Sequence, residues 1–408
     1  MEYPRLRAVD AFPVEHQGQQ LICIRDPLHL TDKALFVPLP LFFIISLFDG
    51  RHTLLDIQEA YMRMFGELLF THQIEEIIQQ LDEHYFLDNE RFQVLRQQVE
   101  QAFLEAPVRE AAHAGLTYPA ERDALERELE GFFSAREGPG AGPLLPDGAR
   151  VCGVMAPHID LRRGGPCSAW AYKALVEAAK ADLFLVFGTG HALSRGLFAL
   201  TRKDFVTPLG VVQTDRAFVE KLAAKYPGDL FQDEFSHKQE HSIEFQLLFL
   251  QYLFRQRPLR IVPILCGSFQ EMILKRVSPQ TVPEVADFIA AVKETVAEQG
   301  EAVCYVAGVD LAHVGQKFGD QIRLTTGLLE SIERKDRAML RYIQALDAEG
   351  FFAFVQEEQD SRRICGLSSI YTMLSVMEAR EGRLLRYEQA VERETQSTVT
   401  YASLAFCV

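Results

Sequence analysis

Two histidines and a cysteine occupy short turns beside apolar runs of this chain. His158 ends an Ala-Pro-His turn after the run at 151–155, and His191 ends a Gly-Thr-Gly-His turn after the run at 183–187. Cys365 lies between an isoleucine and a glycine. Imidazole nitrogen and thiolate sulfur suit a soft or borderline metal ion, and α/β folds place their sites at such sheet edges. These residues are therefore candidate metal ligands.

Each candidate ligand also has a simpler interpretation. A single histidine after a strand is more often structural than a ligand, and an isolated cysteine is more often a buried thiol. Two histidines after strands that look adjacent favour ligation. A helix amino terminus or the neighbouring arginines would lower the pKa of the Cys365 thiol and favour the thiolate.

Further polar residues follow other apolar runs. His241, in a Glu-His-Ser-Ile-Glu stretch, opens a long apolar helix, and acidic residues at 233, 234 and 240 either set its pKa or form a solvated loop. Asp310 and His313 follow the run at 305–309 and are an acid/base pair or a capping aspartate with an incidental histidine. We take His241, Asp310 and His313 as candidate catalytic residues.

Length and composition predict a folded protein of two domains. The chain has 408 residues, of which 48% are hydrophobic and 10% aromatic. A single core rarely serves so many residues, and this composition argues against extensive disorder. The net charge of −15 argues against a general binder of nucleic acid.

The same features favour a cytoplasmic location without a membrane anchor. The longest apolar run, 39–48, is about half of the roughly 20 residues that a membrane span needs, so we expect a core helix there. The amino terminus lacks a secretory signal. Seven scattered cysteines without a Cys-x-x-Cys pair fit a reducing compartment.

The larger region positions the candidate residues through alternating strands and helices. Strand-like runs lie at 151–156, 183–187, 259–265 and 302–307, and helical patterns lie at 169–180, 218–225, 243–254 and 283–299, with further helices to about 381. Such alternation predicts an α/β domain at 105–408, in which helices flank a central, mostly parallel sheet.

Residues 1–100 have a different sequence pattern from the larger region and are predicted to form a separate domain. Strand-like runs at 21–24 and 35–37 precede helices that begin near Thr53 and Thr71, and 85–87 is a predicted strand or wing. This pattern predicts a small α+β domain that resembles the winged-helix-like, PqqD-type peptide-recognition domains. That resemblance implies a peptide ligand, whereas an interaction or stabilising module without a ligand is the simpler interpretation.

Seven motifs of the larger region together resemble the Memo family, protein B of the AmmeMemoRadiSam system. They are Ala-Pro-His, Gly-x-x-His, Thr-Pro-Leu-Gly at 207–210, Glu-His-Ser-Ile-Glu, Asp-Leu-x-His-x-Gly, Ile-Cys-Gly and Ser-x-x-x-Tyr-Ala at 397–402. The similarity runs from about 113 to 408. It implies an α/β fold related to class III extradiol dioxygenases, which use non-haem iron(II).

The resemblance also implies roles for individual residues. His158, His191 and Cys365 match the metal-binding triad of the family, and His241, Asp310 and His313 match polar groups around its pocket, as the motifs show. A thiolate stands where the dioxygenases have a carboxylate, so iron(II) is expected first, with copper(I) or zinc as alternatives.

Two departures change the pocket. Residues 159–163 read Ile-Asp-Leu-Arg-Arg where many members have Ala-Gly-Tyr, and Ala192 replaces a second histidine. The arginines at 162 and 163 contact an anion or, as we favour, pair with Asp160 and nearby acids.

Two functions remain open on this basis. One is an iron-dependent or copper-dependent oxidoreductase, similar to a dioxygenase, in a pathway associated with a radical SAM enzyme. The alternative is a non-enzymatic metal-binding or peptide-binding adaptor, whose partners would be a radical SAM protein, an Amme-domain protein or a peptide.

Overall fold

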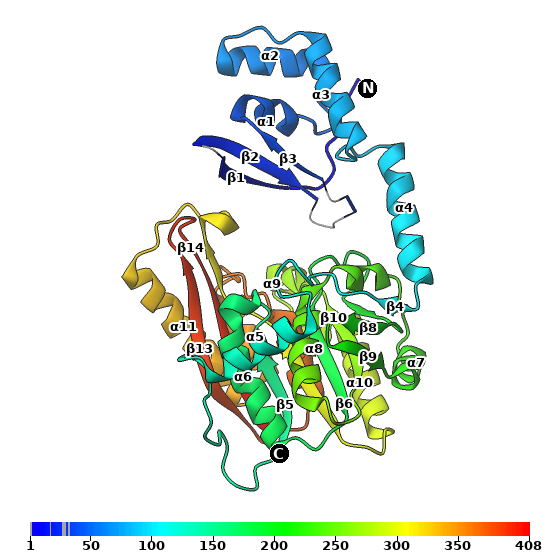
Figure 1. The fold of residues 1–408 in the computed structure, drawn as a ribbon, viewed down its shortest axis with the longest axis vertical. Helices are drawn as coiled ribbons and strands as arrows, with labels where there is room; N and C mark the ends of the chain where they lie inside the picture. Colours follow the sequence, from blue (N-terminus) through cyan, green and yellow to red (C-terminus); the bar gives the residue numbers. More distant parts are fainter. Residues whose placement is uncertain (1, 17, 27–29, 32) are drawn as a thin grey trace. The chain divides into compact units, whose positions relative to one another are not determined.

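A computed structural model describes residues 2–16, 18–26, 30–31 and 33–408 (Figure 1). The chain divides into two compact units, Met1–Glu105 and Ala106–Val408.

The described part of the first unit packs four helices with a three-stranded antiparallel sheet of order β1-β2-β3. Helix α2 begins at a capping box in which Thr53 and Asp56 bond each other's backbone N–H, as the sequence indicates. Ile74 and Leu81 of α3 are buried in the core of this unit. The elements are β1 (Asp10–His16), β2 (Gln19–Arg25), β3 (Ala34–Val37), α1 (Leu39–Ser46), α2 (Leu54–Phe65), α3 (Thr71–Glu83) and α4 (Glu90–Glu105).

Residues 85–87, predicted as a strand or wing, do not form a strand. Leu87 forms only an isolated bridge with Leu6, and the third strand is β1, which the pattern did not reveal. Pro13 interrupts the strand pattern of β1, yet β1 pairs only with β2, and an edge strand tolerates a proline.

The second unit is built on an eleven-stranded sheet of order β12-β14-β5-β11-β6-β10-β9-β8-β4, in which β13 also pairs with β14 and β7 with β10. Strands β5, β11, β6 and β10 are parallel, so their carboxyl ends lie at one edge. The strands are β4 (Val108–Arg109), β5 (Val151–Ala156), β6 (Leu183–Thr189), β7 (Phe198–Leu200), β8 (Asp204–Thr207), β9 (Gly210–Thr214), β10 (Arg260–Cys266), β11 (Val303–Gly308), β12 (His313–Gly315), β13 (Glu381–Glu392) and β14 (Ser397–Cys407).

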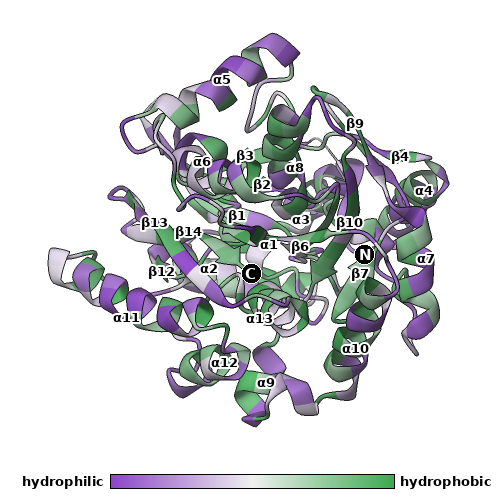
Figure 2. Cartoon of the chain, turned by 90° about the horizontal axis from the view of Figure 1, so that it is seen from below, coloured by the Kyte–Doolittle hydropathy of each residue, from purple (hydrophilic) through white to green (hydrophobic). Residues whose placement is uncertain are grey.

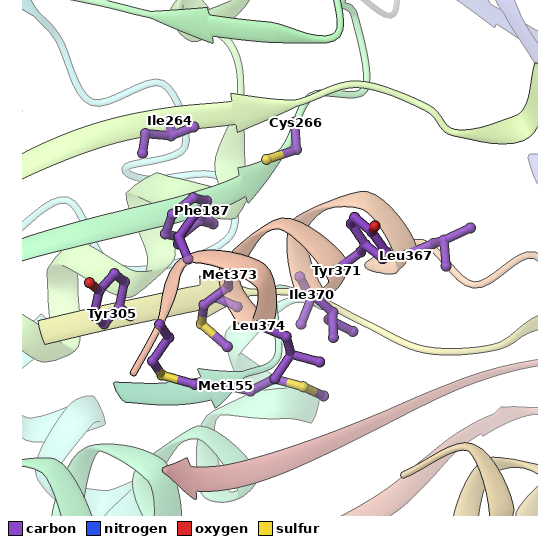
Figure 3. Close-up of a cluster of buried hydrophobic side chains, with 14 of the residues drawn as sticks. Met155, Phe187, Ile264, Cys266, Tyr305, Leu367, Ile370, Tyr371, Met373 and Leu374 are labelled. Carbon is purple, nitrogen blue, oxygen red and sulfur yellow. The ribbon is translucent and has the colours of Figure 1, made fainter. Parts of the chain in front are cut away.

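Helices cover both faces of this sheet, because successive strand residues point to opposite sides. Phe184 and Val186 of β6 pack with α5, α6 and α8, whereas Leu185 and Phe187 pack with α7 and α10–α13. Figure 3 shows Phe187 beside Met373 of α13. The helices are α5 (Arg122–Ser134), α6 (Leu161–Ala178), α7 (Arg216–Lys225), α8 (His241–Phe254), α9 (Gln270–Lys275), α10 (Pro283–Ala297), α11 (Thr326–Gln344), α12 (Ala348–Glu357) and α13 (Leu367–Val376), with 3-10 turns at Glu234–Lys238, Pro279–Thr281 and Gln316–Phe318.

The α/β class with a mostly parallel core is confirmed, and three details differ from the prediction. Strands β5 and β6 are not neighbours, because β11 lies between them. Helix α6 begins at Leu161 rather than near 169, since Gly164 and Gly165 serve close packing against Ile159 and Phe132 rather than a turn. The long hairpin of β13 and β14 was not predicted.

Hydropathy follows this architecture. In Figure 2 the central strands are mainly hydrophobic, whereas hydrophilic and hydrophobic residues alternate along α11. No described helix combines the length and the apolar character that a membrane crossing needs.

Candidate metal centre

Parallel strands bring three candidate residues to one edge of the sheet. His158, His191 and Asp310 each stand two residues beyond the last residue of their strands, β5, β6 and β11. Since β11 lies between β5 and β6, Asp310 stands between the two histidines in the order of the strands. The carboxyl edge of a parallel sheet is the usual place for a site in such folds.

The turn that carries His158 is held by buried hydrogen bonds. Gln246 of α8 donates Nε2–H to the Pro157 carbonyl at 3.1 Å and accepts from the Tyr172 hydroxyl at 2.8 Å. The backbone N–H of His158 donates to Asp310 Oδ1 at 3.1 Å. His158 Nδ1 lies 2.9 Å from the Gly308 carbonyl, which can accept only from a protonated Nδ1, so Nε2 is the nitrogen free to bind.

His191 faces two groups with its two ring nitrogens. Nδ1 lies 3.0 Å from Glu240 Oε2, and Nε2 lies 3.5 Å from the sulfur of Cys365. Glu240 also accepts the backbone N–H groups of His191 and Ser242, at 3.2 and 2.9 Å. A buried carboxylate thus fixes the orientation of the His191 ring.

Cys365 reaches the two histidines from the loop before α13. Its sulfur lies 3.2 Å from His158 Nε2. The backbone N–H of Cys365 donates to Leu311 and that of Gly366 donates to Asp310, at 3.1 and 3.0 Å. A Cβ on Gly366 would stand 2.5 Å from the Val309 Cβ, so only glycine permits this approach.

The segment before Cys365 holds several residues in a costly backbone conformation. Gln359, Asp360 and Arg363 have positive φ angles of 55°, 48° and 52°. Such angles are unfavourable for residues with a Cβ and persist where surrounding contacts impose them. Here Arg363 pairs with Asp320 at 2.6 Å, and buried Arg362 pairs with Asp336 of α11.

The three side chains perturb one another strongly. Burial alone would raise the pKa of the Cys365 thiol, but His158 and His191 hold that pKa well below its ordinary value. Burial alone would lower the pKa of His158, but Cys365 and Asp310 raise it to about 9. The pKa of His191 is likewise raised well above its usual range, by Glu240 and Cys365 against burial. The metal-free centre therefore favours a thiolate between imidazolium groups.

The three candidate catalytic residues lie around this centre in different settings. The ring of His241 stands 5.1 Å from those of both His158 and His191, and burial lowers the pKa of His241 to about 3, so this imidazole is neutral. Asp310 bonds the backbone beside His158, and burial raises its pKa. His313 is half-buried and packs edge-on against Phe318.

A cleft opens beside the sulfur of Cys365. Its volume is about 410 Å³, and its lining includes His191, Ser268, Phe269, His313, Arg363 and Cys365. Aromatic, hydroxyl and charged side chains thus border the candidate ligands, as in many small-molecule sites.

Two contributors were missed as site residues by sequence reasoning. Of the three acids near His241, only Glu240 joins the centre, because Asp233 and Glu234 bond the Ser194 and Thr201 regions. His113 packs edge-on against His241 at 5.7 Å. The Glu-His-Ser-Ile-Glu stretch could have indicated Glu240, but no local signal indicated His113.

The expected internal pairing near His158 is confirmed for one arginine. Arg163 lies 3.1 Å from Asp160 and also pairs with Glu392 of β13.

The donor set and its spacing fit a transition-metal ion. Around a tetrahedral ion with bonds of about 2.0 to 2.3 Å, neighbouring ligand atoms stand roughly 3.3 to 3.8 Å apart. The sulfur of Cys365 lies 3.2 and 3.5 Å from the two imidazole nitrogens, and the three ligand atoms lie within 4.8 Å of one another. Two imidazoles and one thiolate suit zinc, copper or iron.

Comparisons with known proteins agree with the motifs. The sequence profile of a family described as "Memo-like protein" matches residues 109–405. A "MEMO1 family protein" of Aquifex aeolicus is 29% identical over 406 residues, which is 99% of each chain. One of Methanopyrus kandleri is 31% identical over 305 residues, covering 73% of this chain and 98% of the relative. A third, of Thermus thermophilus, is 27% identical over 357 residues, covering 87% and 99%.

Proposed function

This chain belongs to the Memo-like protein family, and on that premise we propose that it binds a transition-metal ion through His158, His191 and Cys365 and uses it for oxidation chemistry. Iron(II) is the leading candidate and copper(I) the redox-active alternative, because one thiolate makes a two-histidine set softer than a carboxylate would. Zinc is the third candidate for binding, but it has no redox chemistry and would not support the oxidation. When bound, an iron or copper ion would supply redox chemistry that no protein side chain offers.

One observation carries this proposal. Side chains from three distant segments converge so that Cys365 Sγ lies between two Nε2 atoms, and each histidine uses Nδ1 to contact a separate acceptor. A second partner on the other ring nitrogen is typical of histidines that bind metals. Structural histidines have no need to direct their remaining nitrogens at one thiolate.

Neighbouring residues supply the other parts of a reaction site. We propose that substrate enters the cleft beside Cys365, where Phe269 and Phe318 exclude water and His313 accepts or donates a proton. His241 is the alternative proton carrier, and Asp310 holds the His158 turn in place. The reaction class would be the oxidation of a small organic substrate, with dioxygen as the oxidant.

Metal analysis tests the proposal directly. The protein is purified without oxygen, reconstituted with iron(II) and assayed for metal by elemental analysis, together with the Cys365→Ser and His158→Ala variants. We expect at least about one ion per chain in the wild type and about one ion fewer per chain in both variants. Cys152→Ser is the matched control, because Cys152 lies at the amino-terminal end of β5, away from the turn that carries His158. A wild type that stays metal-free would contradict the proposal.

A second candidate function rests on the first unit. Apolar side chains of α2 and the following turn are exposed, namely Leu55, Met62, Met64, Leu68 and Phe70. Such a surface is typical of protein or peptide binding. An adaptor that recruits a peptide, a radical SAM protein or an Amme-domain protein would use it, and such recruitment would survive Cys365→Ser.

A further inference from the structure

We propose that the centre has a second metal position, formed by His191, Glu240 and His241, with His191 shared between the two positions. This inference rests on the proposed function and extends it from one metal ion to two. The second ion would be a borderline divalent cation of the zinc class.

The two nitrogens of His191 face different sets of ligands. Nε2 is directed at Cys365 Sγ, 3.5 Å away, whereas Nδ1 is directed at both oxygens of Glu240, at 3.2 and 3.0 Å. One imidazole can therefore contribute to a position on each side of its ring. When the second ion binds, the proton that Nδ1 otherwise donates to Glu240 leaves to solvent.

His241 converges on the same carboxylate. Its Nδ1 lies 3.3 Å from Glu240 Oε1, the oxygen that also faces His191 Nδ1. The two imidazole rings stack at 5.1 Å with an angle of 11° between their planes. The three ligand atoms fall within 4.8 Å of one another, as do those of the first position.

Orientation of His191 alone does not explain this arrangement. A carboxylate that orients one metal-binding histidine needs a single imidazole partner. Glu240 has two, His191 and His241, and its side chain is only 5% exposed. Its oxygens also accept the backbone N–H groups of His191 and Ser242, so the carboxylate is fixed in place between the two imidazoles. The charge of a cation held there would be balanced by a carboxylate that is already in position.

The donor set also suits a particular class of ion. Two imidazoles and one carboxylate are the ligands of catalytic zinc sites and of many iron(II) sites. This set is harder than the one that contains Cys365, so the two positions differ in the ions that they favour. The side chains of His191 and His241 are 44% and 32% exposed, which leaves an entry path for the ion.

Cobalt(II) titration distinguishes the two positions. The metal-free wild-type chain is titrated anaerobically with cobalt(II), bound metal is measured by elemental analysis, and the thiolate-to-cobalt charge-transfer band is recorded. We expect about two ions per chain, of which only the one at Cys365 produces the band. Cys365→Ser should lose the band and retain about one ion.

Two variants address the second position without removing the first. Glu240→Gln keeps an oxygen that accepts from His191 Nδ1 but removes the charge. His241→Leu removes a ligand that belongs to the second position alone. Each should bind about one ion and keep the charge-transfer band. Glu234→Gln is the control, because Glu234 bonds Thr201, and it should behave as the wild type. Circular dichroism establishes that each variant is folded.

The outcomes separate this inference from the proposed function. One ion with the band in the wild type, or two ions in both Glu240→Gln and His241→Leu, would overturn the second position and leave the first intact. Loss of the band and of all metal in folded Glu240→Gln would mean that Glu240 only positions His191. One ion without the band, lost in Glu240→Gln, would support the second position and contradict the first. No bound cobalt in the wild type would contradict both.

Discussion

At the scale of the residue, each candidate ligand is oriented by a hydrogen-bond partner on its other ring nitrogen or on its backbone. The Gly308 carbonyl fixes the His158 ring, Glu240 fixes the His191 ring, and the Leu311 and Asp310 carbonyls fix the backbone at Cys365. None of these contacts requires a metal ion. The centre is therefore organised before any ion binds, which lowers the free energy lost to ordering side chains on binding.

Gly366 provides a test of this organisation. A Cβ at this position would stand 2.5 Å from the Val309 Cβ and 3.0 Å from the Asp310 carbonyl, so Gly366→Ala must displace the Cys365 loop. We expect a loss of about 1 to 3 kcal/mol in the free energy of unfolding, measured by urea denaturation. We also expect a changed rate of thiol modification at Cys365 in the metal-free protein.

Gly327→Ala is the matched control for that substitution. Gly327 lies in the first turn of α11, and apart from its chain neighbours and the backbone of its own helix no atom would stand within 4 Å of an added Cβ. Alanine there should leave the stability unchanged or raise it by up to about 1 kcal/mol. Equal effects of the two substitutions would contradict the role assigned to the Gly366 contact.

At the scale of the element, α8 links most parts of the centre. Its N-cap is Glu240, Ser242 donates to the Thr189 carbonyl at 3.0 Å, and Gln246 holds the Pro157 carbonyl. Glu244, fully buried on the same helix, pairs with buried Arg109. The first two turns of one helix thus fasten β5, β6 and the segment at 109–118.

Acid should lower the stability of the protein by protonating Glu244 and so weakening its pairing with Arg109. Burial alone would raise the pKa of this carboxyl, but Arg109 and His113 hold it below 4.5. The unfolded chain therefore takes up the proton first, so the stability contributed by Glu244 is present above about pH 4.5 and is lost as the pH falls toward the folded pKa. The free energy of unfolding should fall more steeply below pH 5 in the wild type than in Glu244→Gln, measured by urea denaturation at several pH values.

The two proteins, wild type and Glu244→Gln, can also be compared at neutral pH. Glu244→Gln leaves Arg109 without its charged partner, so this variant should be less stable than the wild type at pH 7. Parallel stability curves from pH 7 to pH 4 would contradict the assignment to Glu244.

Packing between β6 and α13 should also contribute strongly to the free energy of unfolding. Phe187 is fully buried against α13 and its neighbours (Figure 3), so Phe187→Ala would remove contacts and leave a cavity. We expect a loss of about 3 to 5 kcal/mol in the free energy of unfolding. Leu274→Ala, at a side chain that is 73% exposed, should change it by less than about 0.5 kcal/mol.

At the scale of the whole molecule, the centre belongs to one of two units. Its candidate ligands and their supporting residues lie in Ala106–Val408, and each unit has a hydrophobic core of its own. The Aquifex aeolicus relative matches 99% of this chain, whereas 73% of the chain accounts for 98% of the Methanopyrus kandleri relative. A Memo-like protein therefore exists at the shorter length.

We accordingly predict that a chain beginning at Ala106 folds and keeps the centre. If the full chain unfolds in one thermal transition, the midpoint of the shorter chain should lie within a few degrees of it. If the full chain unfolds in two, the midpoint should lie within a few degrees of the second. Its metal content after iron(II) reconstitution should equal that of the full chain. Loss of metal from a folded Ala106–Val408 chain would show that the first unit contributes to the centre.

The sequence by itself determined the class of fold and indicated the candidate side chains of the site. Alternating apolar runs predicted the parallel strands within one or two residues at β5, β6, β10 and β11, because a strand buried on both faces is a continuous apolar segment. The candidate site residues just beyond the strand ends could be located as well, because the end of an apolar run marks the end of its strand. The motifs around His158, His191 and Cys365 predicted family membership, which the comparisons confirm.

Only the tertiary structure decided which of these residues meet. The insertion of β11 between β5 and β6, the edge strand β1 and the hairpin of β13 and β14 depend on pairing between distant segments. Glu240 contacts His191, which is 49 residues away, and Cys365 contacts His158, which is 207 residues away. The ring of His113 likewise packs against that of His241, far along the chain. Local pattern reports how a segment buries its own side chains, whereas contacts at such separations follow from the packing of the whole unit.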